Sequence, residues 1–449
     1  MVKKFKKFVK VVKAKAPWIE HVIEGFDDAC DLNPIDVIVK APSGSLCVYC
    51  KGSKMLCGKP QCPILVRAYS LVKVKSIVSS LDIAGSSPPA VFVGRYGYPY
   101  VYAGPLLPPF RGDTRIFDTP ELWLQASIQD IVDFRMKLLR GKARFHVRDA
   151  NEPPKLLEQA QLIAMGARPV NAEMKLLKKP SASLILDDEV QPMGPSAPMK
   201  ELSIEELSVD KHVENAVSDV DLKARDAILE LYERGTPVSQ IQRVFSMGLL
   251  GVKGQRRLVP TRWSITAIDS TISRTLRDEV VKSTPELEEY RVYGLEVMGN
   301  KFVIIMFPGK WSYESIEAWF PGTTWNPSGD LVAFCGDWEG YWGRTTYASM
   351  GGCYYAARLA VTEHLAKIGK QASVLVLREA HPGYIMPVGV WIVRESVRRA
   401  LGGGCERHDN LKDALESAFS KLTINRKLWL QVSRMLREAT RQEKLTRFL

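Results

Sequence analysis

The sequence predicts an α+β protein of two domains, followed by a helical C-terminal segment and a free tail. Two stretches, residues 64–104 and 290–307, mix β-branched and aromatic residues with glycine and proline, as strands and tight turns do. Other stretches repeat apolar residues every three or four positions, which is typical of helices. A chain of 449 residues is too long for one ordinary hydrophobic core, so its length also favours more than one domain.

The first domain is expected over residues 1–176. Its beginning, residues 3–25, places apolar residues among lysines, a pattern that fits a basic amphipathic helix. Strands are expected over 64–104. A helix over 120–141 would have Pro120 in its first turn and Gly141 at its end, and a second helix would span residues 155–165.

Residues 177–218 are interpreted as a linker or an irregular surface strap, because proline, serine and lysine replace the periodic pattern there. A second α+β domain is expected over 219–408. Its elements are helices near 220–234 and 238–246, a loop over 248–257, a strand pair over 290–297 and 302–307, and a tryptophan-rich surface of loops and strands after it. Residues 409–441 predict helices, with Asn410 at an N-cap position.

Composition indicates a globular protein with an anionic partner. Hydrophobic residues make up 46% of the chain, and 62 Lys and Arg against 50 Asp and Glu give a net charge of +12. This excess favours nucleic acid or an acidic membrane surface as a partner. No run of 18 apolar residues occurs, and the basic beginning lacks the features of a signal peptide. We therefore expect a cytoplasmic, nucleoid-associated protein with no membrane partner.

Four of the eight cysteines cluster within sixteen residues as Cys47, Cys50, Cys57 and Cys62. In a reducing compartment such clustering favours a metal over disulfides. The spacing of the first pair suits a tetrahedral Zn²⁺ site, and an iron–sulfur cluster is the alternative because it uses the same four thiolates. Four cysteine ligands leave no open position for a water molecule, so the zinc is expected to be structural.

A basic, glycine-rich loop leads into a helix expected to open near residues 264–266. Exposed backbone N–H groups at a helix start, with cations beside them, can bind phosphate. An arginine next to a tryptophan adds a stacking surface for a nucleotide or a single strand. The candidate nucleic-acid or phosphate-binding residues are Lys253, Arg256, Arg257, Arg262, Trp263, Asp269 and, from a second loop, Arg111.

The sequence does not identify catalytic residues. The common phosphate-loop, hydrolase, zinc-protease and dinucleotide signatures are absent. Nuclease chemistry would need two or more carboxylates converging on a metal, and the second domain offers candidates without a distinctive spacing. These are Glu296, Asp330, Asp337, Glu339 and Glu379, with His364 and His381 as further acid or base candidates.

The last eight residues, 442–449, form the string Q-x-x-L-x-x-F-L. In a 3₁₀ turn, Gln442, Leu445 and Phe448 would share one face, and Leu449 would extend the apolar tip. The string resembles the peptide by which replication and repair proteins bind the DNA sliding clamp PCNA, called the PIP motif. Burying the three apolar side chains would contribute roughly 1.5 to 3 kcal/mol each before ordering costs, which suits micromolar docking.

Taken together, the cysteine cluster, residues 93–109 (VGRYGYPYVYAGPLLPP), residues 258–270 (LVPTRWSITAIDS) and the terminal QEKLTRFL resemble the archaeal Nre family of DNA repair proteins. The resemblance spans nearly the whole chain. It implies that the four cysteines bind zinc and that residues 442–449 bind PCNA. The final pair is Phe-Leu here instead of the family's Phe-Phe, and we expect this to weaken docking only slightly.

These observations predict a DNA repair protein that the sliding clamp recruits through its tail and that contacts DNA or a nucleotide through the basic loop. A non-catalytic adaptor and a metal-dependent nuclease or other DNA- or nucleotide-processing enzyme both remain open. An RNA-modifying protein is a third alternative, which the basic charge and the aromatic-rich loops would also suit.

Overall fold

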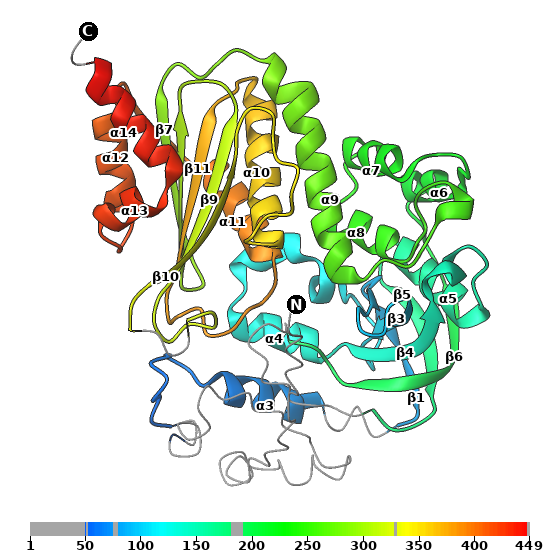
Figure 1. Ribbon diagram of the computed structural model, residues 1–449. Helices are drawn as coiled ribbons and strands as arrows, with labels where there is room; N and C mark the ends of the chain where they lie inside the picture. The colour runs from blue at the N-terminus through cyan, green and yellow to red at the C-terminus, as the bar shows by residue number, and fades with distance from the viewer. Residues whose placement is uncertain (1–49, 51–52, 75–79, 181–191, 327–329, 447–449) are drawn as a thin grey trace, which may run out of the picture.

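The computed structural model describes residue 50 and residues 53–74, 80–180, 192–326 and 330–446. Two six-stranded sheets lie on either side of the long helix α9 (Thr261–Thr275), each with its own layer of helices (Figure 1). The expected mixed α+β class is confirmed. The basic segment 3–25 lies outside the described residues, and the domain boundaries stay predictions.

The first sheet has the strand order β1-β5-β6-β4-β3-β2. Its neighbours are antiparallel except β4 and β6, which run parallel. The strands are β1 (Asp82–Ser87), β2 (Val91–Val93), β3 (Tyr100–Leu107), β4 (Leu139–His146), β5 (Val170–Leu176) and β6 (Ser196–Glu206).

Within the described residues, helices fully cover only one face of this sheet. Inward residues such as Val101, Phe145 and Met174 form a core with α5, α6, α7, α8 and α9. On the opposite face, Leu106 and Leu138 pack beneath η2 and α4 at one end. The covering helices are α5 (Lys155–Met165), α6 (Lys211–Ser218), α7 (Ala224–Glu233), α8 (Val238–Ser246), η2 (Arg115–Asp118), η3 (Pro120–Gln125) and α4 (Ile128–Met136).

The second sheet is covered on both faces. Its strand order is β10-β9-β11-β8-β7-β12, and β9 and β11 are its parallel pair. Along β8, Phe302 and Ile304 face the core that contains α10 and α11, whereas Val303 and Ile305 face the core that contains α12 to α14. The strands are β7 (Tyr290–Val297), β8 (Asn300–Phe307), β9 (Ser312–Trp319), β10 (Ala333–Glu339), β11 (Ser373–Ala380) and β12 (Glu406–His408).

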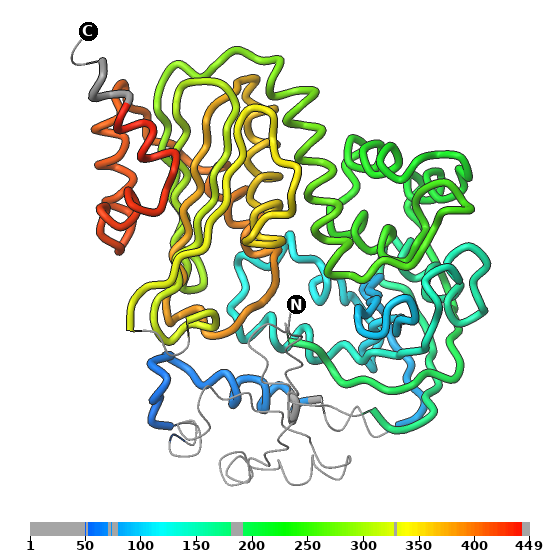
Figure 2. The backbone as a smooth tube through the Cα atoms, viewed as in Figure 1, coloured from blue at the N-terminus to red at the C-terminus, as the bar shows by residue number. Residues whose placement is uncertain are grey.

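The tube in Figure 2 follows the chain from the first sheet through α6 to α9 into the second sheet and then to α12 to α14 at the outer edge. The remaining elements are α3 (Pro63–Val74), η4 (Val147–Ala150), η5 (Lys253–Gln255), η6 (Leu276–Val280), η7 (Val281–Ser283), α10 (Gly352–Ile368), α11 (Trp391–Leu401), α12 (Leu411–Ser420), α13 (Arg426–Val432) and α14 (Arg434–Thr446). No helix among the described residues is long and apolar enough to span a bilayer.

Several expected elements are confirmed. The helices at 155–165 and 238–246 and the strand pair β7–β8 lie where the periodicity placed them. Asn410 caps α12, because its side chain accepts a hydrogen bond from the backbone N–H of Asp413 at 3.0 Å.

Other expectations are wrong. Residues 63–74 form a helix where strands were expected, and Gly141 lies within β4 instead of ending a helix. Residues 196–206, interpreted as part of a linker or strap, form β6 in the middle of the first sheet. Helix α14 continues to Thr446, so the backbone of residues 442–446 is helical and the free tail does not begin at residue 442.

Candidate nucleic-acid interface

The open face of the first sheet carries two rows of side chains. Along β4, residues alternate between inward apolar positions and outward basic ones, and the outward Arg140, Lys142 and Arg144 form what we call the basic row. On the neighbouring β3, Tyr100 and Tyr102 point outward while Val101 is buried. Strand residues two apart share a face, so this alternation fixes both rows on one side of the sheet.

The tyrosines and cations of the two strands contact one another. Tyr100 is paired in register with His146, and Tyr102 with Arg144. The Arg144 guanidinium lies 5.3 Å from the centre of the Tyr100 ring, and the Lys142 ammonium lies 5.7 Å from that of Tyr102. Tyr100 is 51% exposed and Tyr102 is 48% exposed, so these contacts leave about half of each side chain in solvent.

The basic row is not neutralised by neighbouring acids. No salt bridge joins Arg140, Lys142 or Arg144 to an acidic side chain in the part of the chain that the structure describes. Burial, with a contribution from the charge of Arg135, lowers the pKa of Arg140 to about 10, so this residue stays charged at neutral pH. Burial and the charges of Arg140 and Lys178 lower the pKa of Lys142. The row therefore produces a local positive potential.

The predicted basic loop lies against the end of this face. The backbone N–H of Leu258 donates to Val147 at 2.8 Å just after β4, and the Thr261 hydroxyl accepts from the backbone N–H of Val93 at 2.9 Å. The ring centres of Trp263 and Tyr98 are 5.4 Å apart. We call Tyr98, Tyr100, Tyr102 and Trp263 the aromatic row, and both rows together the β3–β4 face.

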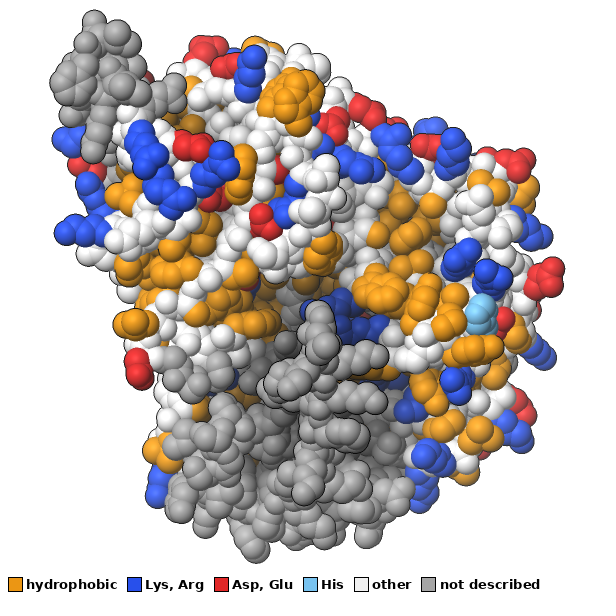
Figure 3. Space-filling view, viewed as in Figure 1, with side chains coloured by type: hydrophobic (Ala, Val, Ile, Leu, Met, Phe, Trp, Pro, Cys, Tyr) orange, Lys and Arg blue, Asp and Glu red, His pale blue; other side chains and the backbone are white. Residues whose placement is uncertain are grey.

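Figure 3 shows hydrophobic and basic side chains side by side over the region that β3, β4 and the start of α9 occupy in Figure 1. Lys253, Arg257 and Arg262 have exposed side chains. Trp263 is 47% exposed. These four predicted residues are therefore accessible to a partner.

Two other predicted residues of the loop region are buried and have partners within the fold, and their assignment to ligand binding stays a prediction. Arg256 is buried and donates to the backbone carbonyls of Gly251, Val217 and Asp219 at 2.7 to 2.9 Å. Asp269 is fully buried in α9, where its carboxylate pairs with Arg394 of α11 at 3.0 Å.

The Asp269 carboxylate is held inside the protein by partners on neighbouring helices. Burial raises the pKa of this carboxyl to about 6, although the charges of Arg394 and Arg398 act in the opposite direction. Gln242 of α8 donates to the same carboxylate at 3.1 Å. Asp269 therefore connects α8, α9 and α11 across the two halves of the molecule.

Arg111 lies in a different part of the first sheet. It forms an ion pair with Glu205 in β6, and the next residue, Gly112, donates its backbone N–H to Ser86 of β1 at 3.0 Å. Strands β1 and β6 are on the opposite side of β4 from β3. The structure therefore does not bring Arg111 together with the loop at 253–263.

The cysteine cluster is described only in part, because Cys47 lies outside the described residues. Burial raises the pKa of the Cys62 thiol, and the charges of Cys57 and Cys50 raise it further, so the three thiols interact electrostatically. Backbone N–H groups of Leu65 and Ile64, at the start of α3, bond to the same sulfur and lower its pKa. Within the described residues, no group of three or more His, Cys, Asp or Glu side chains is placed to hold a metal.

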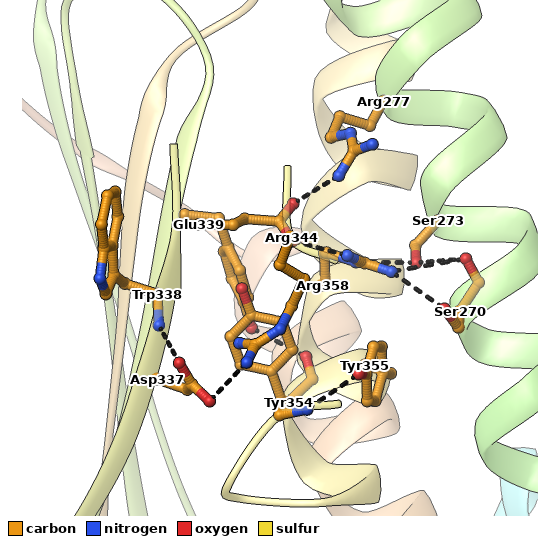
Figure 4. A network of polar contacts seen from close by, with 12 residues as sticks. Ser270, Ser273, Arg277, Asp337, Trp338, Glu339, Arg344, Tyr354, Tyr355 and Arg358 are labelled. Carbon is orange, nitrogen blue, oxygen red and sulfur yellow. Dashed lines mark hydrogen bonds and ion pairs between the residues drawn. The ribbon is translucent and has the colours of Figure 1, made fainter. Parts of the chain in front are cut away.

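The candidate acidic residues of the second domain mostly have partners within the fold. Glu339 of β10 is 1% exposed and accepts from Arg277 at 2.9 Å and from Arg358 at 2.7 Å (Figure 4). Asp337 accepts from Arg344 and from the backbone N–H of Ser349, both at 2.8 Å.

Glu379 is fully buried and accepts backbone N–H groups of Thr423 and Ile424. Asp330 and Glu296 are exposed. These contacts show that the three paired carboxylates stabilise the second domain.

The two candidate histidines are also in structural contacts. Burial lowers the pKa of His364 to about 4, with smaller contributions from Arg291 and Lys367, so this ring is neutral at physiological pH. Its Nε2 lies 3.2 Å from the Tyr293 hydroxyl. His381 stacks on Phe320 and lies 3.0 Å from Glu379.

The clamp-binding string lies at the far end of α14. Gln442 and Leu445 are in the helix, whereas Phe448 and Leu449 lie outside the described residues. The helix is held at its other end, where Glu314 of β9 accepts the backbone N–H groups of Arg434 and Met435, each at 2.8 Å.

Sequence reasoning missed the basic row and the two outward tyrosines of β3. The signal was present in residues 139–146, L-R-G-K-A-R-F-H, where basic and apolar or small residues alternate with period two. Exposed rings beside cations that no acid neutralises, on an open sheet face, are typical features of nucleic-acid-binding surfaces. The fold and the site thus define an α+β protein with an open aromatic and basic sheet face.

Two family models match successive parts of the chain. The family model described as archaeal Nre, N-terminal, matches residues 56–326, and that described as archaeal Nre, C-terminal, matches residues 339–448. The chain is 42% identical to DNA repair protein NreB of Archaeoglobus fulgidus over 90% of this chain and 100% of the relative. No solved structure matches it.

Two further relatives are named DNA repair protein NreA. That of Archaeoglobus fulgidus is 38% identical over 85% of this chain and 95% of the relative, and that of Haloferax volcanii is 37% identical over 79% and 86%. The chain belongs to the archaeal Nre family.

Proposed function

We propose that this protein is a DNA repair protein that contacts DNA through the β3–β4 face. The observation that carries this proposal is the basic row, whose three cations lie on one face of the sheet without acidic partners among the described residues. Lysines and arginines that neutralise phosphates supply most of the non-specific affinity for DNA. The printed names of the three relatives support DNA repair as the setting in which this contact is used.

Removing two charges of the basic row is expected to weaken DNA binding. The double variant Lys142→Gln with Arg144→Gln retains polar side chains of similar length but lacks two cations. The logarithm of the binding constant, plotted against the logarithm of the salt concentration, should become less steep by roughly 0.7 to 0.9 for each phosphate that is no longer neutralised. Fluorescence anisotropy with a labelled oligonucleotide at several salt concentrations measures both quantities.

A matched control is the pair Lys412→Gln and Lys427→Gln, which removes the same charge from exposed positions on α12 and α13. This control should bind DNA like the unchanged protein. An equal loss in the control would mean that net charge, not the β3–β4 face, determines binding. Absence of DNA binding by the unchanged protein would overturn the proposal itself.

Recruitment by the sliding clamp is the second part of the proposed function. The string Q-x-x-L-x-x-F-L at 442–449 supports it, because its glutamine and apolar positions match the clamp-binding pattern. The attachment of α14 to β9 at Arg434 and Met435 also supports it, since the string is then at the end of the helix farther from this anchor.

Structural zinc is the third part. The proposal rests on the donor chemistry of Cys50, Cys57 and Cys62, because cysteine thiolates are preferred ligands of structural zinc. Cys47 would be the fourth ligand. Zinc held by four cysteines would stabilise the segment ahead of α3. This segment packs against the second domain, because Lys59 donates to the carbonyl of Ile385 at 3.0 Å.

Elemental analysis of the purified protein is expected to give about one zinc per chain, as one four-cysteine site binds one ion. Cys62→Ala should lose most of this zinc, because three thiolates remain. Cys335→Ala, a change at a cysteine of β10 far away in the sequence, should retain it. Iron with visible absorption in a freshly prepared sample would instead indicate an iron–sulfur cluster.

A further inference from the structure

We propose that the β3–β4 face binds single-stranded DNA, with unpaired bases stacked on Tyr100 and Tyr102. This inference rests on the proposed function, since it specifies the form of DNA that the face receives. The support comes from the aromatic row, which the phosphate contacts proposed above do not require.

The rings of the aromatic row are accessible to a ligand. Tyrosines on a sheet usually pack against neighbours, but Tyr98, Tyr100, Tyr102 and Trp263 are each 47% to 51% exposed. Desolvating such rings by stacking a base on them is favourable, and it tolerates any sequence because every base has a flat face. Four accessible rings along one edge therefore form a stacking surface.

The spacing of Tyr100 and Tyr102 along β3 differs from the spacing of stacked bases. Residues two apart on a strand are separated by about 6.8 Å, because each residue advances the strand by about 3.4 Å. Stacked bases in one strand of a duplex are about 3.4 Å apart. Bases placed on Tyr100 and Tyr102 would therefore be twice as far apart as in a duplex. The spacing fits an extended, unstacked strand with one base for each ring.

The β3–β4 face is poorly suited to a duplex as its preferred ligand. The faces of paired bases are covered by the pairs above and below, so an aromatic ring reaches them only after an unfavourable unstacking step. Direct readout of a duplex instead needs a helix or ribbon that enters a groove. In the β3–β4 face, β3 lies between β2 and β4 and presents its rings across a sheet. Such a face suits bases that are already unpaired.

The phosphate backbone of the bound strand is expected to lie along the basic row. The Arg144 guanidinium lies over the Tyr100 ring at 5.3 Å and the Lys142 ammonium lies over the Tyr102 ring at 5.7 Å, so a cation lies at one face of each ring and a base would stack on the other. A base stacked on a ring brings its phosphate within reach of the neighbouring cation. Rings and cations in alternation are the combination that sequence-tolerant single-strand binding uses. Trp263 and Tyr98, in contact at 5.4 Å, extend the surface toward the exposed Arg262.

The test compares the full chain with the double variants Tyr100→Ala, Tyr102→Ala and Tyr100→Phe, Tyr102→Phe. The phenylalanine variant keeps both rings and is the matched control. Oligo(dT), a duplex of the same length and oligo(U) serve as probes at one salt concentration. Removing the stack at one ring weakens binding by about 5- to 150-fold, which corresponds to 1 to 3 kcal/mol per base.

We expect the intact protein to bind oligo(dT) more tightly than the duplex or oligo(U). The alanine variant should lose at least about tenfold in affinity for oligo(dT) but change little toward the duplex. The phenylalanine variant should resemble the intact protein. The intact protein, the alanine variant and the phenylalanine variant should share the same thermal midpoint, because the Tyr100 and Tyr102 rings lie at the surface.

Two results separate this inference from the proposed function. If the alanine variant binds oligo(dT) normally while Lys142→Gln with Arg144→Gln binds DNA weakly, the DNA contact stands and the stacking of bases is wrong. If the intact protein binds none of the DNA probes, the proposed DNA contact is wrong and the inference falls with it. A preference for oligo(U) over oligo(dT) would overturn DNA as the ligand.

Discussion

Replacing Glu339 by glutamine is expected to lower the free energy of unfolding by about 3 to 5 kcal/mol, because it removes the shared carboxylate of two buried arginines. Glu339 is 1% exposed, and Arg277 and Arg358 are 4% and 2% exposed. Arg277 keeps Asp278 as a partner at 2.7 Å, but Arg358 would keep no carboxylate partner among the described residues and would retain neutral contacts such as Ser273 at 3.0 Å. An unpaired buried charge is the dominant cost.

The contacts of Glu339 also join distant parts of the second domain. Arg277 comes from η6, Arg358 from α10 and Glu339 from β10, and Figure 4 shows the three side chains converging between the sheet and the helices. Gly343 packs directly on the Arg277 guanidinium, since a Cβ at this glycine would lie 2.3 Å from its Nη1 atom. Loss of the carboxylate should therefore also loosen the loop after β10.

Unfolding by denaturant, monitored by circular dichroism, measures the loss of stability in Glu339→Gln. Glu201→Gln is a matched control, because it removes a carboxylate from an exposed ion pair with Lys175, and its unfolding midpoint should not change. The double variant Glu339→Met with Arg358→Met should recover much of the loss, since apolar side chains of similar volume can replace a buried pair. A midpoint for Glu339→Gln equal to that of the control would contradict the prediction.

Phe448→Ala is expected to weaken binding to the sliding clamp strongly while leaving the fold intact. Burying a phenylalanine side chain contributes about 1.5 to 3 kcal/mol. Since about 1.4 kcal/mol changes an affinity tenfold, micromolar docking should weaken by roughly 10- to 100-fold. Titration calorimetry with a purified archaeal clamp would register this as a loss of heat at accessible concentrations.

Thr446→Ala is the control for the clamp experiment, because Thr446 occupies a variable position of the Q-x-x-L-x-x-F-L string. It should bind the clamp like the unchanged chain, and both variants should share its thermal midpoint. Equal clamp affinity of Phe448→Ala and the unchanged chain would rule out recruitment through this string. Equal loss in both variants would indicate that helix α14, rather than the apolar anchor, controls binding.

Much of the second domain was predictable because its elements follow simple patterns. Helix α8 was expected at 238–246 and lies at Val238–Ser246, and the expected strand pair over 290–297 and 302–307 corresponds to β7 and β8. Here local periodicity and tertiary packing agree, since apolar residues at the expected spacing, such as Ile241 and Val244 of α8, lie in the core.

The first domain was harder to predict because several of its strands carry helix-like or linker-like composition. In β6, prolines favoured the interpretation as a linker, but β4 and β5 on either side supply the pairing that makes residues 196–206 a strand. In β4, Gly141 does not end a helix as predicted, and the absence of a side chain there lets Met174 pack closely against the strand. A Cβ there would lie 2.1 Å from the sulfur of Met174.

Within the predicted site, chemistry was easier to identify than exposure. Arg262 and Trp263 are accessible as expected, whereas Arg256 and Asp269 from the same stretch are buried. The sequence does not reveal that carbonyls of Val217 and Asp219 lie around Arg256, or that Arg394 meets Asp269. Such partners come from segments between about 30 and 130 residues away, so local pattern carries no information on them.

By itself, the sequence determined membership of the archaeal Nre family, the α+β class and the alternation of basic and apolar or small residues along β4. These depend on residue identity and on the period of a strand, which are local properties. Only the tertiary structure decided that the loop at 253–263 lies beside this strand and that Trp263 contacts Tyr98. That contact depends on how α9 packs against the first sheet, because the two rings are separated by more than 160 residues of chain.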